Sequence, residues 1–290
     1  MWVGTLPQLT GTESEGVLAE AAGRVKNEEK LMSDAKVTVR PADLLRAEAW
    51  QFEYRQKSNP ANSSLDLLAY GVYRIAPGAS SDELSHCGEE ALLFCLAGEP
   101  VSVEVEGQNY PMSHYDTLYV PMGTPYRIRN GTNEIQSLVV CRAPAAHRHA
   151  AVHTVWEKVC NDEARIRHLE GKDVFLMFDV TEAADKLMAG YTIYKPFTRA
   201  WPPHNHTDQE EIYLFTKGRG AIEVYADEKS KTFVHSMGTM DAATIPLLNC
   251  HPVFSQEEEL HFIWCLAGAR YWVGDKHKEF LDASVDRLTT

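Results

Sequence analysis

The 290-residue sequence has no long apolar segment and no basic cluster. No stretch approaches the roughly 18 to 20 consecutive apolar residues that a membrane-spanning helix needs, and the N-terminus has no basic segment followed by an apolar run. We therefore expect a cytoplasmic protein that is neither secreted nor inserted into a membrane. The formal net charge of −13 would repel a phosphate backbone, so nucleic acid is not expected as a partner.

Cysteines are few and widely spaced. The six cysteines show no CxxC spacing, and a chain of this length buries enough apolar surface to fold without disulfide bonds. Thiols placed in strands of a protein in a reducing cytoplasm account for them.

From about Val37 onward the sequence consists of short runs rich in Val, Ile, Tyr and Phe, which Gly, Pro, Asn and Asp interrupt. These interruptions recur about every eight to twelve residues, a rhythm that predicts an antiparallel sandwich or barrel. The first 36 residues are instead acidic and Ala-rich, with Val17, Leu18, Ala21 and Val25 at helical spacing. This segment is expected to be an N-terminal arm or a short amphipathic helix.

The strand-rich region contains two similar halves. Sliding the chain from position 91 to position 211 lays the segment Ala91 to Gly98 over the segment Glu211 to Gly218. An internal duplication of this kind predicts two barrels in one chain. The expected boundaries are an arm over residues 1–36, a first barrel over 37–145, a linker over 146–170 and a second barrel over 171–290.

The strongest local pattern is a group of four metal-ligating side chains in the second half. His204 and His206 point the same way from an extended chain, because side chains alternate between the two faces. Glu211 opens the next apolar run, and His251 comes at the end of another predicted strand. Three imidazoles and one carboxylate suit a divalent transition metal and leave coordination positions open, as in catalytic sites. The alternative is four ordinary polar residues on strands.

The spacing His204-x-His206-x4-Glu211-x6-Gly218, followed by Pro246-x4-His251, resembles the two motifs of the cupin superfamily. The resemblance implies an all-β bicupin, in which two double-stranded β-helix (jelly-roll) barrels carry a few short helices.

The first copy of the repeat keeps one ligand position out of four. His86 stands where His206 stands, whereas Ala91 replaces Glu211 and Tyr126 replaces His251. We therefore expect that the first barrel binds no metal and serves packing or oligomerisation. Edge strands of paired barrels commonly dimerise, so a homo-oligomer, at least a dimer, is expected.

Further stretches resemble the sugar-isomerase branch of the cupins, which includes 5-deoxy-glucuronate isomerase and 5-keto-4-deoxyuronate isomerase. They cover residues 114–120, 141–145, 202–206 and 262–264. The resemblance implies an aldose–ketose isomerase of carbohydrate catabolism with one divalent ion, Zn or Mn. The implied substrate is an acidic six-carbon sugar: a deoxyuronate, a uronate or another anionic hexose, such as a 6-sulfonated sugar.

Such a reaction moves a hydrogen between neighbouring carbons and needs a group that transfers a proton. Five side chains are candidates: Glu210, Tyr213, Lys195, Asp275 and His277. If Glu211 faces the barrel interior, alternation turns Tyr213 inward and Glu210 outward, which favours Tyr213. Lys195 precedes the His-x-His motif and could transfer a proton or hold a substrate carboxylate. A core tyrosine and a solvated surface lysine are the alternatives.

An anionic sugar bound by so acidic a protein needs a local cation, because an unpaired buried carboxylate is costly. Arg199, five positions before His204, is the first candidate, and Arg142 follows, with Arg127 and Arg129 next. The indoles of Trp201 and Trp264 could stack on a sugar ring, although most aromatic residues at such positions fill the core.

Two other functions are compatible with this ligand set. A cupin dioxygenase would use the same residues to hold Fe and would consume oxygen. A sugar-binding bicupin without activity would bind its ligand without turnover.

Overall fold

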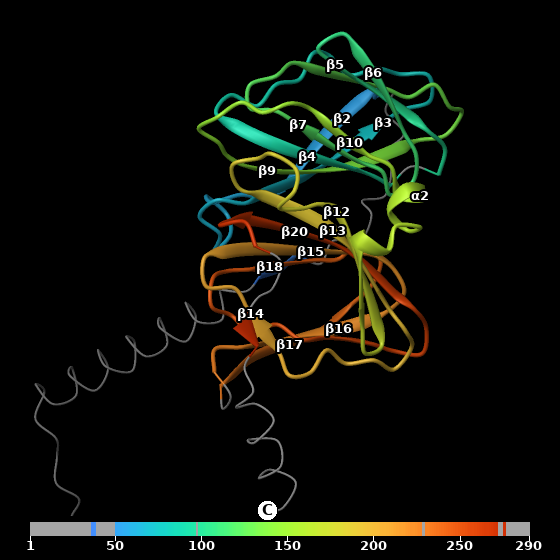
Figure 1. Cartoon of the computed structure of the whole chain (residues 1–290). Coiled ribbons are helices and arrows are strands. Elements are labelled where there is room, and N and C mark those ends of the chain that lie inside the picture. The colour runs from blue at the N-terminus through green and yellow to red at the C-terminus, as the bar shows by residue number, and fades with distance from the viewer. Residues whose placement is uncertain (1–35, 39–49, 97, 228–229, 272–274, 277–290) are drawn as a thin grey trace, which may run out of the picture.

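The computed structural model describes residues 36–38, 50–96, 98–227, 230–271 and 275–276, which form two stacked β-barrels (Figure 1). In the first barrel a six-stranded sheet has the order β10 (Val152–Thr154), β7 (Thr117–Val120), β4 (Glu89–Cys95), β9 (Gln136–Pro144), β3 (Ala69–Ile75), β2 (Phe52–Ser58). A three-stranded sheet covers it, in the order β6 (Gln108–Met112), β5 (Val101–Val105), β8 (Tyr126–Arg129).

The second barrel repeats this plan with an additional edge strand. Its larger sheet has the order β1 (Lys36–Thr38), β18 (Ala242–Ile245), β15 (Gln209–Lys217), β20 (Leu260–Gly268), β13 (Leu187–Tyr194), β12 (Lys172–Phe178), β11 (Ile166–Leu169). The covering sheet has the order β17 (Lys231–Met237), β16 (Gly220–Tyr225), β19 (Val253–Ser255), and β14 (His204–Asn205) pairs with β21 (Asp275–Lys276). Helical structure between the barrels consists of α2 (Trp156–Val159) and the 3-10 turn η1 (Glu163–Arg165). The predicted all-β architecture, with two barrels and a few short helices, is confirmed.

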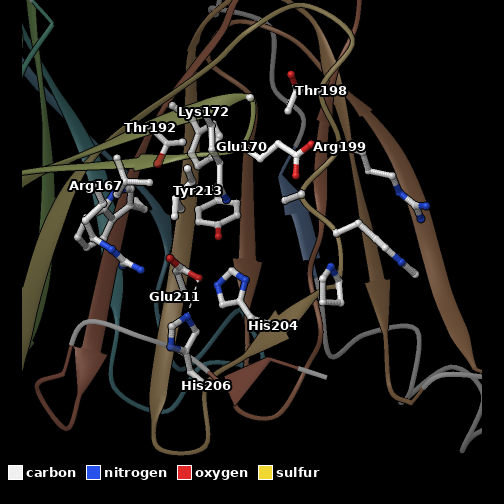
Figure 2. A pocket seen from close by; sticks show the side chains of 18 of the residues that line it. Arg167, Glu170, Lys172, Thr192, Thr198, Arg199, His204, His206, Glu211 and Tyr213 are labelled. Carbon is white, nitrogen blue, oxygen red and sulfur yellow. Dashed lines mark ion pairs between the residues drawn. The ribbon is translucent and has the colours of Figure 1, made fainter. Parts of the chain in front are cut away.

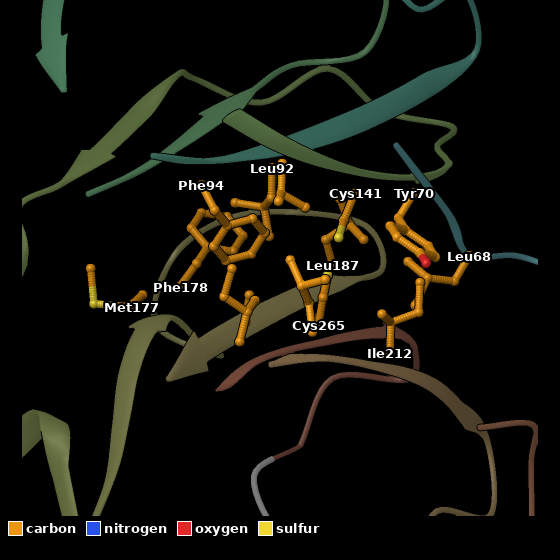
Figure 3. Close-up of a cluster of buried hydrophobic side chains, with 14 of the residues drawn as sticks. Leu68, Tyr70, Leu92, Phe94, Cys141, Met177, Phe178, Leu187, Ile212 and Cys265 are labelled. Atoms are coloured by element: carbon orange, nitrogen blue, oxygen red, sulfur yellow. The ribbon is translucent and has the colours of Figure 1, made fainter. Parts of the chain in front are cut away.

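The central strands are buried on both faces because the two large sheets pack against each other. Along β4, Leu92 and Phe94 belong to the core between the barrels, whereas Leu93 belongs to the interior of the first barrel. Along β15, Ile212 likewise faces the other barrel and Tyr213 faces its own barrel interior. Figure 3 shows side chains of both barrels meeting in this shared core. Alternation along one strand therefore separates residues that join the barrels from residues that face a site.

The two barrels exchange their leading strands. β1 precedes the first repeat but pairs with β18 of the second barrel. β10 precedes the second repeat but pairs with β7 of the first barrel. The expected domain boundaries therefore do not follow the sheets: residues 36–38 join the second barrel, and the segment 146–170 supplies strands to both. The helix expected in the N-terminal arm lies outside the described residues.

Two buried glutamates connect the barrels in a reciprocal way. Glu210 turns outward from its barrel and accepts hydrogen bonds from the backbone N–H groups of Asp66, Leu67 (2.9 Å) and Leu68 (2.9 Å). Its counterpart in the first barrel is Glu90, which accepts from three backbone N–H groups, those of residues 185–187, at 2.7 to 2.9 Å. Each carboxylate thus binds backbone N–H groups at the start of a strand of the other barrel, β3 for Glu210 and β13 for Glu90.

Within the described residues, no helix has the length and apolar character that crossing a membrane requires. None of the six cysteines, all of which lie in the described part of the chain, forms a disulfide bond; Cys95, Cys141, Cys250 and Cys265 are buried, and Cys87 is exposed.

Candidate metal centre and its pocket

Four ligating side chains meet at one end of the second barrel. His204 lies on β14, His206 follows that strand, and Glu211 points inward from β15. A backbone hydrogen bond from the N–H of His251 to the carbonyl of His204 (3.2 Å) brings the fourth side chain beside them. One ligand atom from each residue lies within 4.8 Å of the other three. The structure thus brings together the four residues that the motif spacing identified.

The chemistry of these donors fits a metal ion. Nδ1 of His251 bonds to the carbonyl of Asn249 (2.7 Å), which keeps the proton on that nitrogen and leaves the Nε2 lone pair available. Nε2 of His251 and Nε2 of His206 lie 2.8 and 3.4 Å from Oε2 of Glu211. These three atoms are buried without a partner in hydrogen-bonding geometry. Unsatisfied buried polar atoms are rare and costly, and a cation among them would satisfy all three.

The protonation states also suit metal binding. Burial alone would raise the pKa of Glu211, but the adjacent imidazoles of His206 and His251 hold it below its ordinary value. Burial, together with the neighbouring histidines, lowers the pKa of His204 well below its ordinary value. At neutral pH the site therefore offers an ionised carboxylate and a neutral imidazole, as metal ligation requires.

The cluster opens into a cavity of about 520 Å³. This volume lies within the roughly 300 to 1,000 Å³ range of small-molecule sites. His204, His206 and Glu211 form part of its wall, Tyr213 and Trp264 form another part, and the hairpin of β11 and β12 closes a side (Figure 2).

The predicted catalytic residues lie in different places. Tyr213 is buried in the cavity wall, two residues after Glu211 on the same strand. Lys195 directly follows the end of β13 at Tyr194; it is exposed and is not among the residues that line the cavity. Among the other candidates, Glu210 accepts hydrogen bonds from the backbone of the first barrel. Asp275 is in β21, and His277 lies outside the described residues.

The predicted substrate-binding residues are likewise divided. Arg199, Trp201 and Trp264 line the cavity. Arg199 is 42% exposed, forms an ion pair with Glu223, and its Cζ lies 4.0 Å from the centre of the Trp201 ring. Figure 2 shows it on the far side of the cavity from the His–Glu cluster.

Arg142 lies in the first barrel and does not line this cavity, nor do Arg127 and Arg129. It forms an ion pair with Glu89 (2.6 Å) and donates to the hydroxyl of Tyr54 (3.1 Å). The strand pairings make Leu266, which does line the cavity, the counterpart of Arg142 in the second barrel. Arg142 therefore occupies in the first barrel the position that Leu266 occupies beside the cavity of the second barrel.

In the first barrel, hydrogen bonds occupy the position that corresponds to the ligand cluster. Nε2 of His86 lies 2.8 Å from the hydroxyl of Tyr126 and 3.2 Å from that of Tyr73, and the two hydroxyls are 2.8 Å apart. Burial and the charge of Arg142 lower the pKa of His86 to about 4. These three groups satisfy one another, and the carboxylate is replaced by Ala91.

Three cavity residues on neighbouring strands were not identified from the sequence. Arg167 and Leu169 on β11 and Lys172 on β12 line the wall, but their segment was interpreted largely as a linker. The signal that could have revealed them is the turn dipeptide Glu170-Gly171, which stands between two short segments and directly before the strand that leads to the apolar run 174–178.

Residues 44–282 match the KduI/IolB family. A 4-deoxy-L-threo-5-hexosulose-uronate ketol-isomerase from Bacillus licheniformis is 26% identical over 190 residues, covering 61% of this chain and 67% of that protein. An IolB-like protein from Salmonella typhimurium LT2 has a similar structure, with a TM-score of 0.66, 18% identity, and coverage of 79% of this chain and 94% of its own. The oxalate decarboxylase of Lactobacillus farciminis has a TM-score of 0.62 and 14% identity, and the match covers 89% of this chain and 90% of that protein. This similarity is one of fold. The predicted resemblance is confirmed: the chain belongs to the KduI/IolB family.

Proposed function

We propose that this protein is a metal-dependent aldose–ketose isomerase that acts on an acidic six-carbon sugar in carbohydrate catabolism. Family membership and the ketol-isomerase relative support isomerisation of a sugar. The relative's name specifies a hexosulose uronate, which supports an acidic substrate. The observation that carries the proposal is the convergence of His204, His206, Glu211 and His251 at the wall of a sugar-sized cavity.

Zn or Mn is the proposed ion, held by the three imidazoles and the carboxylate of Glu211. This mixed nitrogen and oxygen set suits either ion and leaves coordination positions open. When bound, a divalent ion would supply Lewis acidity toward the neighbouring carbonyl and hydroxyl oxygens of the sugar.

Tyr213 is the proposed proton-transfer residue. Burial and the charge of Glu211 raise the pKa of its hydroxyl well above the ordinary value. The phenol is therefore protonated at neutral pH, so it would donate a hydrogen bond or proton to a substrate oxygen rather than begin as a base. Trp201 and Trp264 would contact the sugar ring, and Arg199 would act at the rim of the cavity.

The test combines metal analysis with an NMR assay in D₂O. Purified protein would be assayed with 4-deoxy-L-threo-5-hexosulose uronate and with a panel of hexuronates and sulfonated hexoses. We expect isomerisation with exchange at C2, loss of activity on chelation, and loss in His206→Ala. His235→Ala, an exposed histidine on β17, is the matched control.

The absence of exchange or isomerisation throughout that panel would refute the isomerase. Oxygen consumption that depends on ferrous iron would favour a dioxygenase, and saturable binding without turnover would favour a sugar-binding bicupin.

We also propose that the protein is a cytoplasmic homo-oligomer, at least a dimer. β2 is an edge strand of the first large sheet and β11 is an edge strand of the second, and such edges favour pairing between copies. Light scattering coupled to size exclusion should give at least twice the mass of the chain; a monomer would contradict this.

A further inference from the structure

Two cationic side chains enter the cavity from the hairpin of β11 and β12. Arg167 pairs with Val174 across this hairpin, and Leu169 pairs with Lys172. Val174 belongs to the interior core of the second barrel, and residues directly opposite or two apart share a face. Arg167 and Lys172 therefore both face the interior, as diagonal neighbours. Figure 2 shows both side chains directed toward the side of the cavity where Glu211 and Tyr213 lie.

The amino group of Lys172 contacts a tyrosine side chain. Its Nζ donates to the hydroxyl of Tyr194 (3.1 Å) and lies 5.0 Å from the centre of that ring. No carboxylate of the described residues forms an ion pair with it. Burial and the nearby charge of Arg167 lower its pKa to about 8, so it is still mainly a cation at neutral pH. Among the described residues, the carboxylate that favours its charge is Glu211, which belongs to the metal cluster.

The first barrel provides an internal comparison. Following the strand pairings outward from β4 and β15 makes Phe52 the counterpart of Lys172. Phe52 stacks on Tyr73, with ring centres 5.4 Å apart. The six-stranded sheet ends at β2, so within the described residues no strand of the first barrel corresponds to β11 or to Arg167. Both cations occur only in the barrel that carries the ligand cluster.

We propose that Lys172 and Arg167 form the subsite that binds the anionic terminus of the sugar. This inference rests on the proposed function and specifies how its substrate is oriented: the acidic carbon lies at the β11–β12 hairpin, and the reacting carbons lie toward the metal cluster. A guanidinium can bind a carboxylate or a sulfonate through two parallel hydrogen bonds, and the ammonium adds a third. Arg199, already paired with Glu223, then acts at the rim.

The test measures binding rather than turnover, so it does not depend on the isomerase being correct. Zinc-loaded full-length protein would be titrated by calorimetry with D-glucuronate, with 6-deoxy-6-sulfo-D-glucose and with neutral D-glucose. Lys172→Met and Arg167→Gln should each raise the Kd for an acid by about 10- to 100-fold, which is the loss of one charge-assisted hydrogen bond. The Kd for D-glucose and the zinc content should not change.

Two further variants distinguish charge from structure. Lys172→Arg keeps the cation and should keep most of the preference for the acid. Lys217→Met removes the same charge from an exposed position of the same barrel and should bind like the wild type. The acid that loses more affinity identifies the terminus, carboxylate or sulfonate, for which the site is built.

The proposal is overturned if Lys172→Met and Arg167→Gln weaken D-glucose as much as the acids, or leave acid binding unchanged. It is also overturned if the wild type binds neither acid more tightly than D-glucose. If acids bind as expected but no sugar is isomerised, the subsite stands and the proposed function fails.

Discussion

Glu210 and Glu211 are neighbours on β15, but they face opposite sides of the strand and should respond differently to the same substitution. Glu210→Gln alters the contact between the barrels, where one carboxylate oxygen accepts from the backbone N–H of Asp66 and the other from those of Leu67 and Leu68. In Glu211→Gln the change falls in the metal cluster. We expect the first variant to lose stability and the second to lose metal affinity.

The magnitude follows from the hydrogen bonds. Glutamine keeps one accepting oxygen and places an NH₂ group against backbone N–H donors, so one or two of the three bonds are lost. Hydrogen bonds to a charged group contribute about 1.5 to 3 kcal/mol each, so losing one or two of them predicts that the free energy of unfolding falls by about 1.5 to 6 kcal/mol. For Glu211→Gln in the metal-free protein the loss should be smaller, because Oε2 of Glu211 is buried without a partner in hydrogen-bonding geometry, whereas both oxygens of Glu210 accept backbone N–H groups.

Urea unfolding followed by circular dichroism, with chelator present, measures the first effect, and metal titration measures the second. Glu211→Gln should weaken metal binding by more than the roughly 10- to 100-fold that loss of an outer-shell partner costs. Glu257→Gln, at an exposed position, is the control for both. The reasoning would be refuted if Glu210→Gln unfolds at the wild-type urea concentration, or if it loses metal affinity while Glu211→Gln does not.

Three further predictions concern the metal and the cavity. Zinc at about 100 times its Kd should raise the free energy of unfolding by about 2.7 kcal/mol, seen as a higher unfolding temperature that chelation reverses; a temperature unaffected by either treatment would contradict the site. Burial and the charge of Arg167 lower the pKa of Lys172 to about 8, so the affinity for an acidic sugar should fall as the pH rises through that value. Lys172→Met should show no such fall in affinity. Equal pH profiles for the two proteins would argue against a role for the Lys172 cation. At Gly190 an added Cβ would meet the carbonyl of Phe175 and would lie 2.6 Å from Cζ2 of Trp264. Gly190→Ala should therefore lower the free energy of unfolding by about 1 to 3 kcal/mol through overpacking. An unchanged urea unfolding curve would contradict this prediction.

Local patterns predicted much of this protein. The alternation of apolar residues indicated strands, the turn residues indicated their lengths, and the similarity of residues 91–98 to residues 211–218 indicated two barrels. The spacing of His204, His206 and Glu211 selected three members of the cluster because side-chain direction in a strand depends on sequence position alone. Alternation also predicted that Glu210 would point away from its own barrel, although not what it would bind there.

Only the tertiary structure decided which distant segments share a wall. Arg142 and Lys195 were chosen by their place near motifs, but neither lines the cavity of the second barrel, and Lys195 is exposed beyond β13. Pairing between β11 and β12 instead turned part of an expected linker into the cavity wall that carries Arg167. The periodicity of a strand states which residues share a face, whereas the identity of the strand beside it depends on contacts between residues far apart in the chain, which no local pattern contains.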